Sequence, residues 1–190
     1  MKADSFEQVE IISAQELWVW LAANHTRETG VWLVTWKAIR RDRYVSREEV
    51  LDALIAYGWI DGRRMVLDAD LTMQLISPRR EQTWAQTYKR RAERLEREGR
   101  MMPAGHAAAA ASRKAGKWDA MAHVDRLEIP PDLADALETK GAVAWWDRAA
   151  PSYRRNVLRW IEIAKRPATR AKRIDAVTQA AALGEKVPNY

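Results

Sequence analysis

The stretch Tyr57-Gly-Trp-Ile-Asp-Gly-Arg-Arg64 decides how this chain folds, because it places charge inside a run that otherwise reads as a β-strand. The run continues through an apolar segment to a turn at Asp68-Ala-Asp70, after which Leu71-Thr-Met-Gln-Leu-Ile-Ser77 returns as a second strand. Two such runs joined by a short polar turn predict an antiparallel hairpin.

The alternation of side chains along this hairpin predicts which residues share a face. Asp61, Arg63 and Met65 fall on one face of the first strand. Met73 is expected on the same face of the second strand, and Ser77 is expected near Asp61. Because a charge on an apolar face needs a partner or a ligand, we predict either a binding site here or an ordinary structural ion pair between Asp61 and Arg63.

Three helices are predicted around the hairpin by capping boxes, in which two side chains satisfy free amide groups at a helix start. The boxes are Ser13-Ala-Gln-Glu16, Ser46-Arg-Glu-Glu49 and Thr83-Trp-Ala-Gln86. The β-branched and aromatic run 31–37 predicts an interior strand. Together these elements predict an α+β fold with a small antiparallel sheet of about three strands packed with helices.

The rest of the chain reads as helical. Pro103 and Gly116 bracket an alanine-rich helix, and Pro130-Pro131 opens the C-terminal part. Four short helices are expected there, at about 131–139, 142–149, 152–164 and 168–183. We therefore predict an α+β domain over 1–116 that carries the candidate site, a linker over 117–129 and an all-helical region over 130–190.

The composition excludes several classes of function. Without cysteine there are no disulfides and no thiolate chemistry, and three scattered histidines lack the spacing of a metal site. No metal and no cofactor is therefore expected. Residues 1–13 lack the apolar core of a signal peptide, and no apolar run approaches the roughly 20 residues that span a bilayer. These features predict a cytoplasmic protein without a transmembrane segment, and they leave its oligomeric state open.

The net charge of +6 is unevenly distributed. Residues 152–175 hold eight basic residues against two acids, and residues 79–100 hold eight against four. Such clusters attract phosphates, acidic lipids or acidic proteins, although a solvated helix face gives the same pattern.

Several segments in order resemble one known family. In the first half they are Val31-Trp-Leu, Ala56-Tyr-Gly-Trp-Ile-Asp-Gly62, Ser77-Pro-Arg-Arg80 and Glu98-Gly-Arg-Met-Met-Pro-Ala-Gly105. In the second half they are Ser152-Tyr-Arg-Arg155, Arg159-Trp-Ile-Glu162 and Ala164-Lys-Arg-Pro167 followed by Thr169-Arg-Ala-Lys-Arg-Ile174. From about residue 14 to about residue 185, the chain thus resembles the YdeI/OmpD-associated (OmdA) family, also labelled bacteriocin-protection.

This resemblance implies a small bacterial protein in a stress-tolerance context and implies no reaction or cofactor. The chain departs from the family pattern after Trp84. The family usually has a small hydroxyl residue directly after this tryptophan and an asparagine four residues after it. Here Ala85 and Tyr88 stand at these positions.

The first functional hypothesis is a non-catalytic binding module for a small anionic or planar ligand. Indole rings near lysine and arginine suit such a ligand through stacking and bidentate hydrogen bonds. The candidate ligand-binding residues are Trp36, Lys37, Trp59, Asp61, Arg63, Arg79, Arg80 and Trp84. The structural alternative is that the tryptophans fill the core and the charges form an ion pair.

Two further hypotheses use other residues. The basic C-terminal helices could bind nucleic acid or an acidic protein, through Arg154, Arg155, Arg159, Arg166, Arg170 and Arg173. An enzyme could use Asp61 as a general base with Lys37 as an electrophile, although none of the usual catalytic constellations is complete. Convergence of Lys37 and Asp61 in one pocket would favour a ligand or a reaction.

Overall fold

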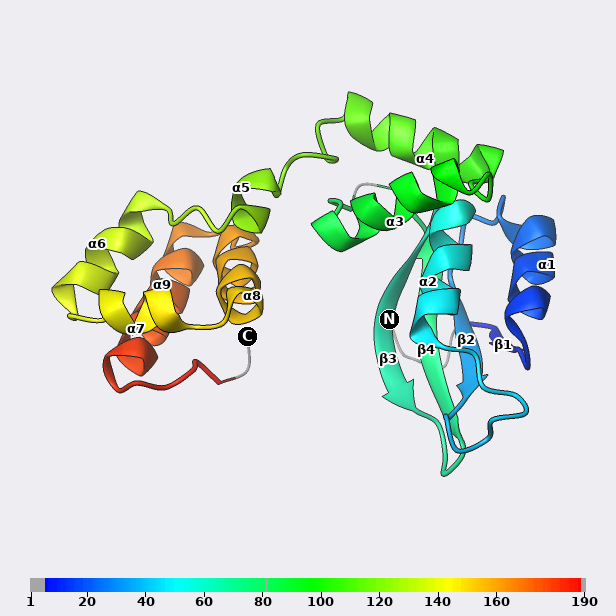
Figure 1. The fold of residues 1–190 in the computed structure, drawn as a ribbon, viewed down its shortest axis with the longest axis horizontal. Helices are drawn as coiled ribbons and strands as arrows, with labels where there is room; N and C mark the ends of the chain where they lie inside the picture. The colour runs from blue at the N-terminus through cyan, green and yellow to red at the C-terminus, as the bar shows by residue number, and fades with distance from the viewer. Residues whose placement is uncertain (1–5, 81, 189–190) are drawn as a thin grey trace. The chain divides into compact units, whose positions relative to one another are not determined.

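The computed structural model describes residues 6–80 and 82–188, and the chain divides into two compact units, Met1–Asp119 and Ala120–Tyr190. The first unit contains the sheet, and the second is helical in its described residues (Figure 1). Across this described part of the chain, none of the helices has the length and apolarity that crossing a bilayer requires.

The sheet has four strands in the order β1-β2-β4-β3. They are β1 (Gln8–Glu10), β2 (Val31–Trp36), β3 (Trp59–Val66) and β4 (Leu71–Pro78). The predicted hairpin is β3–β4, and β4 also pairs antiparallel with β2. The α+β prediction is confirmed, with one addition: β1 pairs parallel with β2 at the edge. A three-residue strand is too short to show a period of two, so sequence analysis missed it.

Two helices, α1 (Ala14–Asn24) and α2 (Arg47–Ala56), cover one face of the sheet. Leu17 and Leu21 of α1 pack with Leu54 of α2 against Leu33 and Ile76 of the strands. Burying such side chains stabilises this layer by roughly 1.5–3 kcal/mol each. The Ser46 capping box forms as predicted, and the Ser13 hydroxyl accepts the predicted hydrogen bond from the Glu16 amide.

The predicted shared face of Asp61 and Met65 is wrong, because a bulge interrupts β3 between Asp61 and Arg64. Asp61 pairs with Ile76, whereas Met65 pairs with Met73, so the first pair faces the helices and the second pair faces away from them. The extra residue reverses the alternation beyond the bulge. Ser77 pairs with Ile60 and also lies on the opposite face from Asp61.

Two further helices, α3 (Gln86–Arg97) and α4 (Pro103–Lys114), lie at the end of the sheet where β3 begins (Figure 1). The capping box predicted from Thr83 is wrong, since α3 starts at Gln86 without a side-chain cap. Trp84 instead lies in an extended segment whose amide donates to the Lys117 carbonyl. At the α2–α4 crossing, a Cβ on Gly105 would lie 2.3 Å from the Ala56 carbonyl oxygen, so only glycine fits.

The second unit contains α5 (Ala122–Asp125), α6 (Pro131–Thr139), α7 (Val143–Arg148), α8 (Pro151–Glu162) and α9 (Pro167–Ala182). The last four helices lie close to their predicted ranges. Leu133, Trp146, Val157 and Val177 are fully buried together in its core.

The segment 117–129, for which we expected a linker, carries buried side chains of both units. Trp118 packs into a cluster of the first unit, and Val124 packs into the core of the second. The boundary between the units lies within this segment, after Asp119.

Candidate functional site

The residues predicted to bind a ligand near the sheet do not form one site. Trp59 and Trp84 are fully buried, and the Trp59 Nε1 donates to the His25 carbonyl at 3.2 Å. Trp36 lies at the other end of the sheet, where its Nε1 donates to Glu10 Oε1 at 3.0 Å. The indole rings of Trp59 and Trp84 therefore lie in the packed core, which is where the structural alternative placed the tryptophans.

Lys37 and Asp61 do not converge. The Lys37 Nζ donates to the carbonyls of Asp68 and Ala69, both at 2.7 Å, at the turn of the hairpin. The Lys37 amide donates to the Asp70 carbonyl, whereas Asp61 pairs with Ile76, which places the two about 20 Å apart along the sheet. This separation contradicts the enzyme hypothesis that used both side chains on one substrate.

Arg63 and Arg80 lie apart from Asp61. The Arg63 guanidinium lies 5.8 Å from the centre of the Trp32 ring, and Trp32 belongs to the sheet face that points away from α1 and α2. Arg80 donates to the Glu28 carbonyl at 2.8 Å. The Asp61–Arg63 ion pair that we considered from the sequence is therefore absent.

Asp61 is instead held by Tyr88 and Gln74. The Tyr88 hydroxyl, which comes from the first turn of α3, donates a short hydrogen bond to Asp61 Oδ1. The Gln74 side-chain amide donates to Asp61 Oδ2 at 3.1 Å. The sequence marked Tyr88 only as a departure from the family pattern, and its contact with Asp61 was missed because nothing in the sequence shows that α3 approaches the start of β3.

Arg79 completes this cluster from the end of β4. Its guanidinium stacks 4.1 Å from the centre of the Trp84 ring and 5.4 Å from that of Tyr88. Arg79 is only 8% exposed, and burial lowers its pKa to about 10 against the opposing charge effects of Tyr88 and Asp61. Burial, followed by the hydrogen bond to Asp61, raises the pKa of Tyr88 above its ordinary value. Of the predicted residues, Asp61, Arg79 and Trp84 thus lie together around Tyr88.

Tyr88 also lines a groove of about 770 Å³ between α2 and α3, which we call the arginine groove. Five arginines dominate its walls, and three acids contribute from α2. The lining residues are Arg47, Glu48, Glu49, Leu51, Asp52, Thr87, Tyr88, Arg90, Arg91, Arg94 and Arg97.

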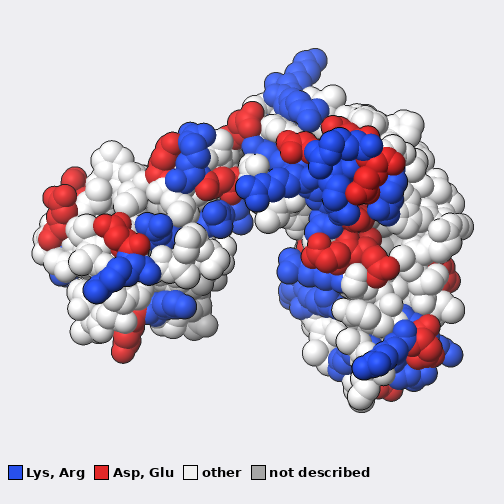
Figure 2. Space-filling view, in the orientation of Figure 1, with Lys and Arg blue, Asp and Glu red and all other residues white. Residues whose placement is uncertain are grey.

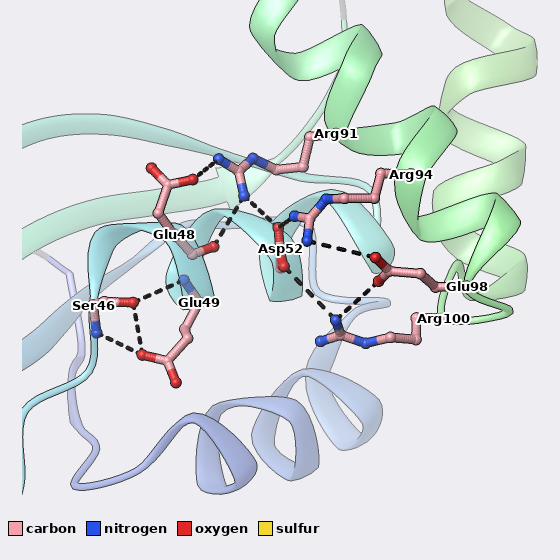
Figure 3. Close-up of polar contacts among 8 residues, drawn as sticks. All are labelled: Ser46, Glu48, Glu49, Asp52, Arg91, Arg94, Glu98 and Arg100. Atoms are coloured by element: carbon pink, nitrogen blue, oxygen red, sulfur yellow. Dashed lines mark hydrogen bonds and ion pairs between the residues drawn. The ribbon is translucent and has the colours of Figure 1, made fainter.

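A ladder of ion pairs joins α2 to α3 at this groove (Figure 3). Arg91 binds both Glu48 and Asp52, and the Arg94 Nη2 lies 2.5 Å from Asp52 Oδ1. The Asp52 side chain is 9% exposed and the Arg91 side chain 12%, so both charges are largely removed from water. The third acid, Glu49, is held by Ser46 in the capping box. Each acid of the groove therefore already has an ion-pair or hydrogen-bond partner within the protein.

The other three arginines of the groove have no carboxylate partner in the described part of the chain. Within the described residues, Arg47, Arg90 and Arg97 form no ion pair, and all three are exposed. Figure 2 shows Lys and Arg atoms crowded over α2 and α3, with acidic atoms between them. The groove thus combines a concave surface with unneutralised guanidinium groups.

Most of the arginines predicted to bind a polyanion in the second unit have partners inside that unit. Arg155 and Arg159 lie 3.7 and 3.6 Å from the buried Asp125, and Arg154 lies 3.9 Å from Asp147. Arg170 binds Asp132 through two nitrogens and also pairs with Glu162. Arg173 stacks on the Trp160 ring and donates to its carbonyl. Of the six, only Arg166 has a side chain without an ion pair or hydrogen bond within the described residues.

No arrangement suited to a metal is found in residues 6–80 and 82–188, where no group of three or more histidine, aspartate or glutamate side chains converges.

Two family models match the chain. Residues 9–108, more than half of the sequence, match the family described as Domain of unknown function (DUF8412). The chain belongs to this family. Residues 126–184 match the family described as Bacteriocin-protection, YdeI or OmpD-Associated, which confirms the predicted resemblance. The segments quoted for that resemblance between Val31 and Gly105 fall within the DUF8412 match. No curated protein and no solved structure matches the chain.

Proposed function

We propose that the N-terminal unit is a non-catalytic binding module that takes an anionic ligand in the arginine groove. The observation that carries this proposal is the presence of Arg47, Arg90 and Arg97, exposed and without ion pairs in the described residues, around one concave surface. Guanidinium groups bind phosphate and carboxylate oxygens with paired hydrogen bonds, so free arginines in a groove favour such a ligand.

The spacing of these arginines favours a ligand with more than one anionic group. Arg90 and Arg97 are seven residues apart on α3, which corresponds to two turns on the same side of the helix and about 10 Å along its axis. Arg47 contributes from the first turn of α2 across the groove. A ligand that spans the groove can therefore meet several guanidinium groups at once.

The ion pairs of Asp52 give this groove a fixed wall. Because Arg91 and Arg94 are bound to Asp52, they hold α2 and α3 together instead of competing for the ligand. Tyr88 is held in the same way by Asp61. Binding groups on fixed elements lose less conformational entropy when the ligand arrives.

The match of residues 126–184 to the family described as bacteriocin-protection supports a stress-tolerance context for the chain as a whole. A second candidate function is nucleic-acid or acidic-protein binding by the C-terminal unit. The observation in its favour is that Lys165, Arg166 and Lys172 are exposed and have no ion pairs within residues 120–188.

Thermal unfolding with inorganic phosphate, pyrophosphate and ATP as probes, at constant ionic strength, tests the first function. We expect the melting temperature to rise with the concentration of pyrophosphate or ATP, because a ligand that binds the native state stabilises it. The double variant Arg90→Ala, Arg97→Ala should lose this response.

The matched control is Lys165→Ala with Arg166→Ala, which removes the same charge from the other unit. It should keep the wild-type response. The proposal fails if the wild-type protein responds to none of the probes. It also fails if the control variant loses as much of the response as the groove variant does.

A further inference from the structure

A separate surface lies at the hairpin end of the sheet, and we call it the loop tip. It comprises residues 37–44, which lead from β2 toward α2, and residues 64–70, which contain the β3–β4 turn (Figure 1). Large apolar side chains are exposed there. Ile39 is 79% exposed and Val66 68%, and Tyr44 and Leu67 are 42% and 37% exposed. Several exposed apolar side chains on adjoining loops are typical of an interaction surface.

The two segments of the loop tip are held together. The Lys37 amide donates to the Asp70 carbonyl at 2.8 Å, and the Lys37 Nζ donates to the Asp68 and Ala69 carbonyls. Arg40 and Arg43 both stack on the Trp36 ring, at 4.8 and 5.0 Å from its centre. The exposed apolar side chains therefore project from an ordered platform.

The charge of the loop tip is positive. Its basic residues are Lys37, Arg40, Arg41, Arg43 and Arg64, against the acids Asp42, Asp68 and Asp70. Two of the acids are already engaged. Asp68 Oδ1 accepts hydrogen bonds from the amides of Asp70 and Leu71, and Asp42 lies between Arg40 and Arg43 at 3.6 and 3.5 Å. The ammonium of Lys37 donates only to neutral carbonyls within the described residues, so its charge stays uncompensated.

We propose that the loop tip docks on an anionic lipid surface. Ile39, Val66 and Leu67 would enter the boundary between headgroups and acyl chains, and the surrounding lysine and arginines would meet the lipid phosphates and carboxylates. Apolar side chains ringed by basic ones match the two layers of such a surface. A nucleic acid would leave the aliphatic side chains in water, and a purely apolar partner would leave the charges unmatched. This docking uses none of the residues of the arginine groove.

The test is co-sedimentation of the full chain with vesicles of phosphatidylcholine alone and with vesicles that also contain phosphatidylserine. We expect binding to the anionic vesicles and weak binding to the neutral ones. The double variant Ile39→Asp, Val66→Asp should bind the anionic vesicles about tenfold more weakly or worse, because two buried side chains are lost from the contact. Arg41→Glu should weaken binding and make it less sensitive to salt.

The matched control is Val19→Asp, which places a charge at a 60% exposed apolar position of α1 in the same unit. It should bind like the wild-type protein. All four positions are exposed, so circular dichroism should show native secondary structure in every variant. Failure of the wild-type protein to bind anionic vesicles, equal binding to neutral vesicles, or an equal loss in Val19→Asp would each overturn the proposal. A loop tip that serves a protein partner would give the first of these results.

Discussion

The two units of this chain both carry arginine-rich helices, and they use these arginines differently. On α8 and α9, Arg155 and Arg159 face the buried Asp125, and Arg170 holds Asp132. On α3, Arg91 and Arg94 are bound to Asp52, while Arg90 and Arg97 stay unpaired among the described residues beside a groove. The run with the larger net charge, 152–175, thus offers fewer free guanidinium groups than its sequence suggests.

The density of charge along a sequence therefore does not measure the charge that is available to a ligand. If a guanidinium leaves the buried carboxylate that it neutralises, the carboxylate remains as an unpaired charge in the low-dielectric interior, which is unfavourable. An arginine is free to bind an added ligand only where the nearby carboxylates already have other partners.

The largest effect is expected for Asp52→Ala. It leaves the largely buried Arg91 and the more exposed Arg94 without their shared carboxylate, which should lower the free energy of unfolding by about 3 kcal/mol. Asp132→Ala is the control, because its carboxylate also binds an arginine but is 48% exposed, and should cost about 1 kcal/mol or less. Denaturant unfolding with hydrogen exchange of α2 and α3 measures the difference. Equal losses in the two variants would contradict the distinction.

The next effect concerns α8. Arg155→Glu with Arg159→Glu places two acids beside the buried Asp125 and should cost about 2 kcal/mol of stability. Lys165→Glu with Arg166→Glu makes the same change in charge at positions without ion pairs in the described chain, and should stay within about 0.5 kcal/mol of wild type. Denaturant unfolding compares them. A stable Arg155, Arg159 variant would show that these arginines are free for a polyanion.

A smaller effect is expected for Asp61→Asn. Asparagine keeps the shape and an acceptor for the Tyr88 hydroxyl, so the loss should be about 1 kcal/mol and arise from the missing charge. Since Arg63 lies on the other face of the sheet, a double-mutant cycle of Asp61→Asn with Arg63→Ala should be additive within about 0.5 kcal/mol. A larger coupling energy would show that Asp61 and Arg63 do interact, as the sequence suggested.

The smallest effect is a dependence of stability on alkaline pH. The pKa of Tyr88 is raised in the folded state, so its protonated form stabilises the fold fully below about pH 10, the pKa of an unfolded tyrosine. This contribution is lost as the pH rises further toward the folded pKa, because the unfolded chain then binds fewer protons than the native one. Unfolding of the wild-type protein and Tyr88→Phe from pH 8 to 11 should show a steeper loss in the wild type. Parallel curves would contradict the shift.

Much of the fold could be predicted because its signals are local. The hydroxyl of Ser46 and the glutamate three residues later define the start of α2 within a single turn. Gly58 ends that helix with a φ of +71°, and Pro131 and Pro167 stand at the first turns of α6 and α9. Each of these residues acts on the backbone within about one turn of its own position, so its effect can be predicted from a short stretch of sequence.

The failures involve groups that depend on distant neighbours. The bulge after Asp61 moves Met65 to the other face. A glycine inside a strand often marks a bulge, and Gly62 stands at this one, but the prediction assumed regular alternation across it. Thr83 has the sequence of a cap, yet the packing of Trp84 against Trp118 keeps this segment extended and delays α3 to Gln86. Burial of a large indole outweighs one capping hydrogen bond.

The α+β class, the ends of most helices, the hairpin and the two arginine-rich regions can all be predicted from the sequence. Which arginines are free, that Tyr88 holds Asp61, and that Lys37 belongs to the loop tip at the far end of the sheet follow from the folded arrangement alone. The two groups of features differ in the distance along the chain over which they are set. Caps, turns and periodicity are set within a few residues, whereas the state of a charge depends on the carboxylates and rings that folding brings beside it.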